Sequence, residues 1–466
     1  MGLLVDSPIS TKIRKMRSRV RWGAPEIRNQ GIDQTRLHIE DGLAETPAFS
    51  FLVLGDSGFG PQPYGHPQRE VAQYLATQMR DCRFLLHTGD VVYQMGAPEQ
   101  YPANFIAPYH EWLMGGDRSA TIDYRNLVFR KPFLAVPGNH DYYNLPFPYG
   151  LMVAAAQPLR HLFNIPISQN VSLRGSASGD TYARAFVDYL KDVPTSLLPT
   201  YLDQHYTTET DTGRSLTYQP SQFTRLPNRY YHFRHADIDF FGLDSSTFNH
   251  PVEAEGGKGL EAETLPRDLA AEIDWEQLFW LRDRLVASLQ NPQVRGRILF
   301  CHHPPYVTEM TKLNERACLT VRRHLRWVLD AVAQRIGEPA PQPLVNLVLS
   351  GHAHCFEYLR TVATGHADSH LNWVICGGSG ARLRIQDPDV TTVQEGRGDQ
   401  KRVVAKSQIF VGRQETTSGT RWPYSFLRID VQEAEDGDRP QFVIRPFVAE
   451  LHNGKWQRSE LSSLVL

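Results

Sequence analysis

The chain has 466 residues, of which 41% are apolar and 21% are charged, and its 49 Lys and Arg residues nearly balance its 51 Asp and Glu residues. A chain of this length can bury a large core, and a formal net charge of −2 argues against a dedicated nucleic-acid-binding protein. No apolar run reaches the length of about eighteen residues that a membrane helix needs, and the opening MGLLVDSPIS lacks the features of a signal peptide. We therefore expect a soluble, cytoplasmic protein without a membrane partner.

The first 48 residues differ in character from the remainder. Basic residues from Lys12 to Arg21 alternate there with Ile13, Met16 and Val20. We expect residues 1–48 to form a basic N-terminal arm, because short charge runs are usually solvated faces or frayed termini. Contact with an anionic surface or polymer is the functional alternative.

From residue 49 onward, short apolar runs each end in a loop rich in Gly, Asp, Asn or His. This pattern predicts buried strands of a mixed sheet. The predicted strands are Phe49–Leu54, Phe84–His87, Phe133–Val136, Ile238–Leu243, Arg297–Cys301, Leu344–Leu349, Trp373–Cys376, Phe426–Val431 and Phe442–Val448. Helical periodicity occurs between several of them, at Arg69–Met79, Asp274–Leu289 and Val321–Ile336. The fold class is therefore α/β, with residues 49–466 as one domain.

Three segments interrupt this rhythm of strands and helices. Residues 94–130 and 145–228 are rich in Pro, Tyr, Gly and polar residues, and both are expected to be insertions over one face. The longer one, 145–228, is interpreted as a lid that shapes the substrate site. Residues 386–420 are polar and are expected to form a surface excursion.

Residues able to bind metal follow five of the predicted strands. Asp56, Asp90, Asn139, His302 and His354 each lie in a loop just after an apolar run. Ligands gather at the carboxyl ends of strands in α/β sheets, so these loops can converge on one crevice. Carboxylate, amide and imidazole donors suit hard or borderline metal ions, and a carboxylate can bridge two of them. Asp90, in the central loop, is the expected bridge.

The loops together resemble those of a known enzyme family. They read GDSG (55–58), GDVVY (89–93), GNHD (138–141), a histidine–any–proline step at His302–Pro304, and GHAH (351–354). These blocks, in this order, are similar to the five blocks of the purple acid phosphatases, within the wider calcineurin-like metallophosphoesterases. The resemblance implies a four-layer sandwich, in which two mixed sheets are flanked by helices, with loop insertions.

One difference from the commoner metallophosphoesterases makes this chain resemble the purple acid phosphatases more closely. The commoner metallophosphoesterases carry a histidine two residues after the first aspartate, where this chain has Gly58. Tyr93, three residues after Asp90, resembles the tyrosinate that supplies the ligand in the purple enzymes. The chain leaves no room for the additional N-terminal domain of the larger plant-type members, so it resembles the small type.

Carried over by position, the resemblance implies a ligand set for two metal ions. The first ion would be held by Asp56, Asp90, Tyr93 and His354, and the second by Asp90, Asn139, His302 and His352. The implied ions are Fe(III) and a divalent ion, which is Fe, Zn or Mn. Their combined charge exceeds that of two carboxylates and a phenolate, so the centre would attract a phosphate dianion and acidify bound water.

Three further residues are candidates for the chemistry. His140 follows the amide ligand and is expected to contact a phosphate oxygen or to protonate the leaving group, with Asp141 orienting its ring. In the HHPP sequence, His302 takes the ligand position and His303 is left to face the substrate.

The sequence thus predicts a binuclear-metal phosphoesterase that hydrolyses small-molecule phosphate esters by attack of metal-bound hydroxide. Two alternatives remain. One is a phosphodiesterase or nucleotide-type hydrolase that uses the same site. The other is a metal-bound redox or binding protein without turnover.

Overall fold

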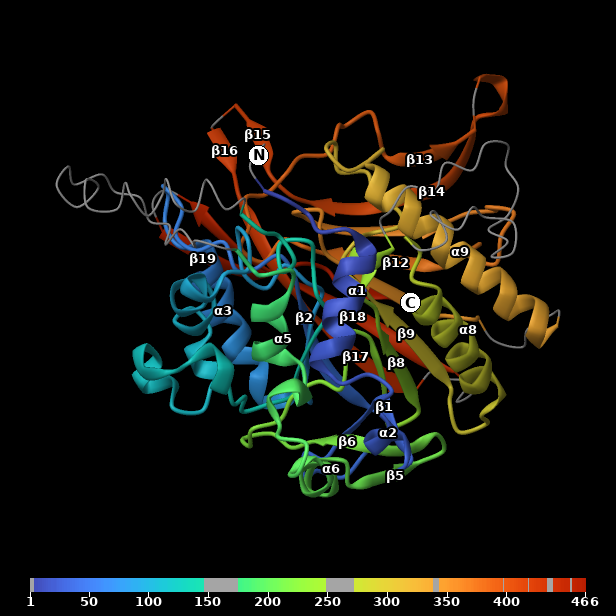
Figure 1. Cartoon of the computed structure of the whole chain (residues 1–466). Coiled ribbons are helices and arrows are strands. Elements are labelled where there is room, and N and C mark those ends of the chain that lie inside the picture. Colours follow the sequence, from blue (N-terminus) through green and yellow to red (C-terminus); the bar gives the residue numbers. More distant parts are fainter. Residues whose placement is uncertain are drawn as a thin grey trace.

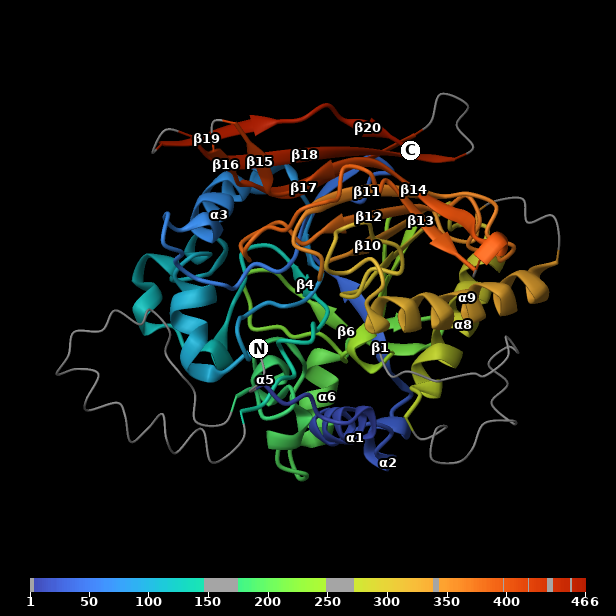
Figure 2. The ribbon, with the colours of Figure 1, turned by 90° about the horizontal axis from the view of Figure 1, so that it is seen from above.

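A computed structural model describes residues 4–145, 175–248, 272–337, 343–396, 398–417, 419–433, 439–452 and 455–466. Across these ranges the chain forms two large mixed sheets with helices on their outer sides (Figures 1 and 2), which confirms the predicted α/β class. Within the same ranges, no helix combines the length and the apolar character needed to cross a membrane.

The first sheet has seven strands and contains both early and late parts of the chain. Its parallel part is formed by β2 (Phe49–Leu54), β3 (Leu85–His87) and β4 (Phe133–Ala135). On the other side of β2 the sheet continues with β17 (Pro423–Glu433), β18 (Pro440–His452) and β19 (Lys455–Glu460), and β20 (Leu464–Val465) also pairs with β18. The C-terminal hairpin therefore completes the sheet that the N-terminal motifs begin.

The second sheet has eleven strands in the order β13-β14-β11-β12-β10-β9-β8-β7-β1-β6-β5. In chain order their bounds are β1 (Ile32–Ile39), β5 (Thr208–Thr210), β6 (Gly213–Tyr218), β7 (Tyr231–His235), β8 (Ile238–Gly242), β9 (Gly296–Phe300), β10 (Leu347–Ser350), β11 (Phe356–Thr361), β12 (Asn372–Cys376), β13 (Thr392–Glu395) and β14 (Arg402–Val411). A separate hairpin is formed by β15 (Gln414–Thr416) and β16 (Gly419–Arg421).

Alternating apolar side chains explain the four layers. On β9, Ile298 and Phe300 join the core shared with the first sheet, whereas Leu299 joins a second core with the helices. Successive strand residues point to opposite faces, so a strand that is apolar throughout can serve both cores. The helices of the second core are α8 (Trp275–Gln290) and α9 (Arg316–Ile336), and α3 (Pro67–Gln78) packs on β17 and β18.

The segment expected to be a basic arm is part of the fold. It forms α1 (Ile9–Arg19), α2 (Pro25–Arg28) and β1, and β1 pairs with β6 and β7 inside the larger sheet. Ile9 and Met16 are buried on one side of α1, and even Lys12 is buried there because its Nζ donates to Asp6 and to the carbonyl of Ser246. The expectation of a solvated arm is thus corrected, because the apolar residues between the basic ones form a packed face.

The three interrupting segments also contribute to the body of the protein. Residues 94–130 form short 3-10 and π-helical turns that bury Tyr101, Phe105 and Trp112. Of the segment 145–228, residues 146–174 lie outside the described residues, and the remainder supplies α5 (Asp180–Phe186), α6 (Leu198–His205), β5 and β6. Residues 386–420, expected to be a surface excursion, instead supply β14, which pairs with β11 and buries Val404 and Ala405.

Candidate metal centre

The predicted ligand loops converge at the carboxyl ends of parallel strands. Asp56, Asp90 and Asn139 follow β2, β3 and β4 of the first sheet. His302 and His352 follow β9 and β10 of the second sheet. The two sheets face one another, so their strand ends place donors on both sides of one buried space.

Tyr93, Asp56 and His354 form one half of the site. The Tyr93 hydroxyl donates to Oδ1 of Asp56 at 2.8 Å and lies 3.2 Å from Nε2 of His354. Nδ1 of His354 lies 3.0 Å from the carbonyl oxygen of Arg382, which makes Nδ1 the protonated nitrogen. Nε2 of His354 is therefore left as a lone-pair donor that faces the carboxylate and the phenol.

Asn139, His302 and His352 form the other half. Nε2 of His302 lies 3.0 Å from Oδ1 of Asn139 and 3.2 Å from Nδ1 of His352. The remaining polar atoms are occupied, because Nδ1 of His302 faces the Thr88 carbonyl at 2.9 Å and Nδ2 of Asn139 donates to Tyr143. The lone-pair atoms that remain are Nε2 of His302, Oδ1 of Asn139 and Nδ1 of His352. They point toward one another, as ligands of a common ion do.

Asp90 lies between the two halves. One of its oxygens is 3.4 Å from Nε2 of His302, and the other accepts the backbone N–H of His140 at 2.8 Å. Donor atoms of Asp56, Asp90 and His302 lie within 4.8 Å of one another, and so do those of His302, His303 and His352. The Asp90 carboxylate thus lies close to donor atoms of both halves of the site.

Two residues that the sequence did not single out complete the second half. Oε2 of Glu315 lies 2.6 Å from Nε2 of His352, which directs Nδ1 of that ring toward His302. Nζ of Lys312 lies 2.7 Å from Oε1 of Glu315. Glu315 is the N-cap residue of α9, so its sequence position resembles an ordinary helix start and gives no separate signal of this contact.

The backbone at the site is strained where the ligands attach. Asp56, Asp90 and His352 have φ values of 54°, 51° and 66°, a left-handed conformation that is uncommon for residues other than glycine. Such conformations persist where the surroundings enforce them, and they cluster at functional sites. Residue 138 must be a glycine because Asp90 lies so close to it that a Cβ would be 2.1 Å from Oδ1 of Asp90.

Gly58 occupies the position where commoner relatives carry a histidine, and the structure has no space for that side chain. A Cβ at Gly58 would lie 1.9 Å from the carbonyl oxygen of Val91. The Gly58 carbonyl accepts the backbone N–H of Tyr93 at 2.8 Å. The loop that excludes a side chain at residue 58 therefore also holds Tyr93 in place.

Electrostatics within the centre favour a bound cation. Burial raises the pKa of Asp56 to about 8, and the neighbouring Asp90 charge adds to that rise. Burial also disfavours the ionised form of Asp90, but His302, His140 and His352 together outweigh burial and hold the Asp90 pKa well below its usual range. Burial lowers the pKa values of His352 and His354 to about 4 and about 3, so both imidazoles are neutral, as metal ligands must be.

The three predicted chemical residues have different surroundings. Nδ1 of His140 bonds the Gln94 carbonyl at 2.5 Å, and Nε2 faces Asp90 at 3.9 Å. Asp141 does not orient this ring, contrary to expectation, because its carboxylate instead accepts the N–H groups of Gly138 and Val91. His303 is buried, and its Nδ1 lies 3.0 Å from Oγ of Ser245, which also accepts the backbone N–H of His302 and of His303.

The donor set fits two metal ions. All of its members are carboxylate, phenol, amide oxygen or imidazole groups, which are ligands for hard and borderline metals. The groups fall into two halves joined by a carboxylate, and four of the side chains already have a hydrogen bond on the atom that would not coordinate.

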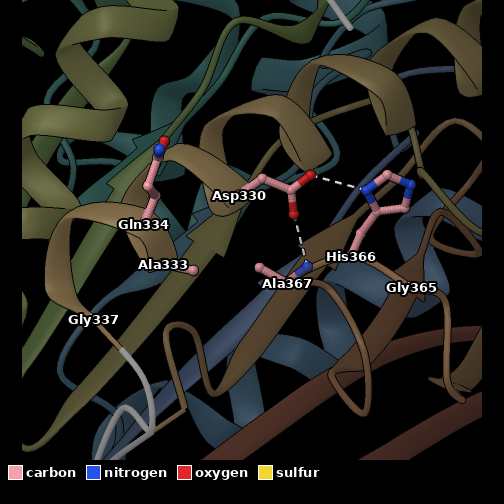
Figure 3. A pocket seen from close by; sticks show the side chains of 7 residues that line it. All are labelled: Asp330, Ala333, Gln334, Gly337, Gly365, His366 and Ala367. Carbon is pink, nitrogen blue, oxygen red and sulfur yellow. Dashed lines mark hydrogen bonds and ion pairs between the residues drawn. The ribbon is translucent and has the colours of Figure 1, made fainter. Parts of the chain in front are cut away.

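A surface cavity elsewhere contains none of these residues. It has a volume of about 550 Å³ and lies between α9 and the loop around His366 (Figure 3). Asp330 accepts from Nδ1 of His366 at 2.8 Å and from the Ala367 N–H at 2.7 Å. Both side chains of the pair are about 40% exposed, so this cavity lacks the buried donors that the metal centre has.

Several solved structures are similar to this chain at low sequence identity. A purple acid phosphatase, PPD1, from yellow lupin (Lupinus luteus) seeds is 13% identical, with 91% of this chain and 54% of that chain covered and a TM-score of 0.47. This chain thus spans about half of the lupin protein's length. A structure of PhoD is 13% identical, with 91% and 70% covered and a TM-score of 0.42. GAP50, the anchor in the inner membrane complex of Plasmodium, is 12% identical, with 89% of each chain covered and a TM-score of 0.41.

A search of curated proteins found no match to this chain. The sequence model of the calcineurin-like phosphoesterases, in contrast, matches residues 49–356, which is well over half of the 466 residues. The matched range contains every predicted ligand from Asp56 to His354. The chain therefore belongs to the calcineurin-like phosphoesterase family.

Proposed function

We propose that this protein hydrolyses small-molecule phosphate esters at a pair of metal ions, in the manner of a purple acid phosphatase. The observation that carries the proposal is the orientation of the donors. Nε2 of His302, Nε2 of His354 and Nδ1 of His352 are each left open by a hydrogen bond on the opposite ring nitrogen. Ligand geometry of this kind, fixed by second partners, is typical of metal sites.

Asp56, Tyr93 and His354 would hold the first ion, Asn139, His302 and His352 would hold the second, and Asp90 would serve both. A phenolate is a hard anionic donor, so we infer Fe(III) at the first position and a divalent Fe, Zn or Mn ion at the second. When bound, two such cations would supply positive charge that polarises the phosphate group and lowers the pKa of a water molecule.

The chain's own residues supply proton transfer and orientation. In the overall reaction a water oxygen forms a new bond to phosphorus, the bond from phosphorus to the ester oxygen breaks, and the leaving alcohol takes up a proton. His140 is the proposed proton-transfer residue. The Gln94 carbonyl accepts from its Nδ1–H, so Nε2, which faces the site, would take the proton lost by the attacking water and pass it to the leaving alcohol. Asp141 holds the backbone of the adjoining loops and takes no part in proton transfer in this proposal.

The experiment combines metal analysis with a substrate panel. Protein purified without chelators should contain two metal ions per chain, and it should release inorganic phosphate from monoesters such as p-nitrophenyl phosphate. Higher kcat/KM for bis-p-nitrophenyl phosphate or for nucleotides would favour the phosphodiesterase alternative. Protein with a full metal load and no turnover of any ester would support the non-catalytic alternative and reject the proposal.

A further inference from the structure

Lys312 contacts His352, a proposed ligand of the metal centre. Its Nζ lies 2.9 Å from Nε2 of His352 and 2.7 Å from Oε1 of Glu315. The Lys312 side chain is 20% exposed, whereas that of His352 is 8% exposed and that of Asp90 is 1% exposed. Lys312 is therefore the more solvent-exposed neighbour of the buried residue His352.

The contact with His352 places the Lys312 ammonium beside a proposed ligand of the second ion. At this separation its positive charge can act on an anion bound at that ion.

The hydrogen bonds of Lys312 leave donors free for a ligand. An ammonium group has three N–H donors, and Glu315 accepts one of them. When Nδ1 of His352 serves as a ligand, its Nε2 carries a proton that is donated to Glu315, so Nε2 cannot accept from Lys312. Two of the ammonium donors then remain for an oxygen acceptor in the site.

We propose that Lys312 binds a non-bridging oxygen of the substrate phosphate and makes the site selective for dianionic monoesters over monoanionic diesters. This inference rests on the proposed function and specifies its substrate class. A phosphate monoester carries a charge of about −1.5 to −2 at neutral pH, whereas a diester carries a single charge. Coulomb attraction scales with that charge, so removing the Lys312 cation weakens monoester binding more than diester binding.

The test compares Lys312→Met with Lys312→Arg, and uses Lys406→Met on the exposed surface of β14 as the matched control. Calorimetry of the metal-loaded proteins with inorganic phosphate should show affinity about 10- to 100-fold weaker in Lys312→Met, the range for a charged hydrogen bond. Lys312→Arg should recover most of that affinity, and Lys406→Met should match wild type. The kcat/KM for p-nitrophenyl phosphate should fall more than that for the bis-ester, with metal content unchanged.

The outcomes separate this inference from the proposed function. Unchanged phosphate affinity in Lys312→Met, equal losses for both esters, or loss of metal from the variant would each overturn the role of Lys312. Wild-type protein that binds no inorganic phosphate would overturn it as well. Phosphate binding that depends on Lys312, in a protein that turns over no ester, would keep the binding site and reject the enzymatic proposal alone.

Discussion

The Tyr93 hydroxyl lies 2.8 Å from Oδ1 of Asp56, in the loop region where Gly58 leaves no space for a side chain. If this phenol binds Fe(III) as phenolate, charge transfer from ligand to metal gives the protein a visible colour. Tyr93→Phe should abolish the colour and weaken iron retention, because the ring still packs while the oxygen is lost. Tyr143→Phe is the matched control, since Tyr143 bonds the amide of Asn139 and should leave the colour in place. Metal affinity that is unchanged in Tyr93→Phe would reject the tyrosinate assignment.

Asp90→Ala should remove metal from both positions, because Asp90 is the proposed ligand of both ions. Turnover should fall below detection, and metal analysis should show less than one ion per chain retained. Asp399→Ala, at an exposed position, should keep the metal load and activity of wild type. A fully loaded and active Asp90→Ala protein would make the whole ligand assignment wrong.

His140→Ala should keep both ions and lose rate. Removing a general acid typically costs about 10²–10⁴ in rate, and the loss should be smaller for esters whose leaving group needs no proton. The measurement is kcat for a series of aryl and alkyl phosphates with leaving groups of different pKa. Equal losses across the series would count against proton donation by His140.

Glu315→Ala should weaken binding of the second ion, although Glu315 is not a proposed ligand of that ion. Nε2 of His352 bonds Oε2 of Glu315 at 2.6 Å, and loss of such a partner typically costs about 10- to 100-fold in metal affinity. Competition with a chelator would measure the change, and Glu315→Gln, which keeps an acceptor oxygen, should lose less. Glu415→Ala on the exposed strand β15 serves as the control. Equal metal affinity in Glu315→Ala and wild type would show that His352 needs no such support.

Glu357 should make stability depend on pH. Burial raises the pKa of this carboxyl from 4.5 to about 7, although the Thr308 N–H bonds it at 3.1 Å. Between those values the native protein holds a proton that the unfolded chain has released, so stability falls as pH rises through the window. The fall amounts to about 3 kcal/mol, taking about 1.4 kcal/mol per pKa unit. Urea unfolding of wild type and Glu357→Gln at pH 5 and pH 8 should show a smaller change in the variant, and parallel curves would contradict the shift.

The sequence predicted the strands that carry the site more accurately than the rest of the fold. The run Phe49–Leu54 coincides with β2, and β9, β10 and β12 lie within a few residues of their predictions. These strands are buried on both faces, so their apolar runs are continuous and easy to recognise. β1, β6 and β14 were missed, because polar and basic residues along them hide the apolar positions that pack.

In the candidate site, the proposed metal ligands were predicted and several of the contacts around them were not. Asp56, Asp90, Tyr93, Asn139, His302, His352 and His354 were all predicted, and the structure brings their donor atoms together. Motif spacing gave no information about which side-chain hydrogen bonds form, either between neighbouring residues or between distant segments. The expected pairing of Asp141 with His140 was therefore wrong, and the contacts of Glu315 and Lys312 with His352 were missed.

The strand β2, which leads to the first ligand loop, pairs with β17, a strand from a much later part of the chain. Val53 of β2 lies opposite Leu427 of β17, so the strand leading to Asp56 has one neighbour that the ribosome adds only after all of the proposed ligands. A nascent chain lacking residues 423–433 would expose the edge of β2 while already carrying the Asp56 and Asp90 loops. We therefore expect premature stop codons between residues 355 and 423 to yield aggregation-prone fragments, even though every proposed ligand would be present.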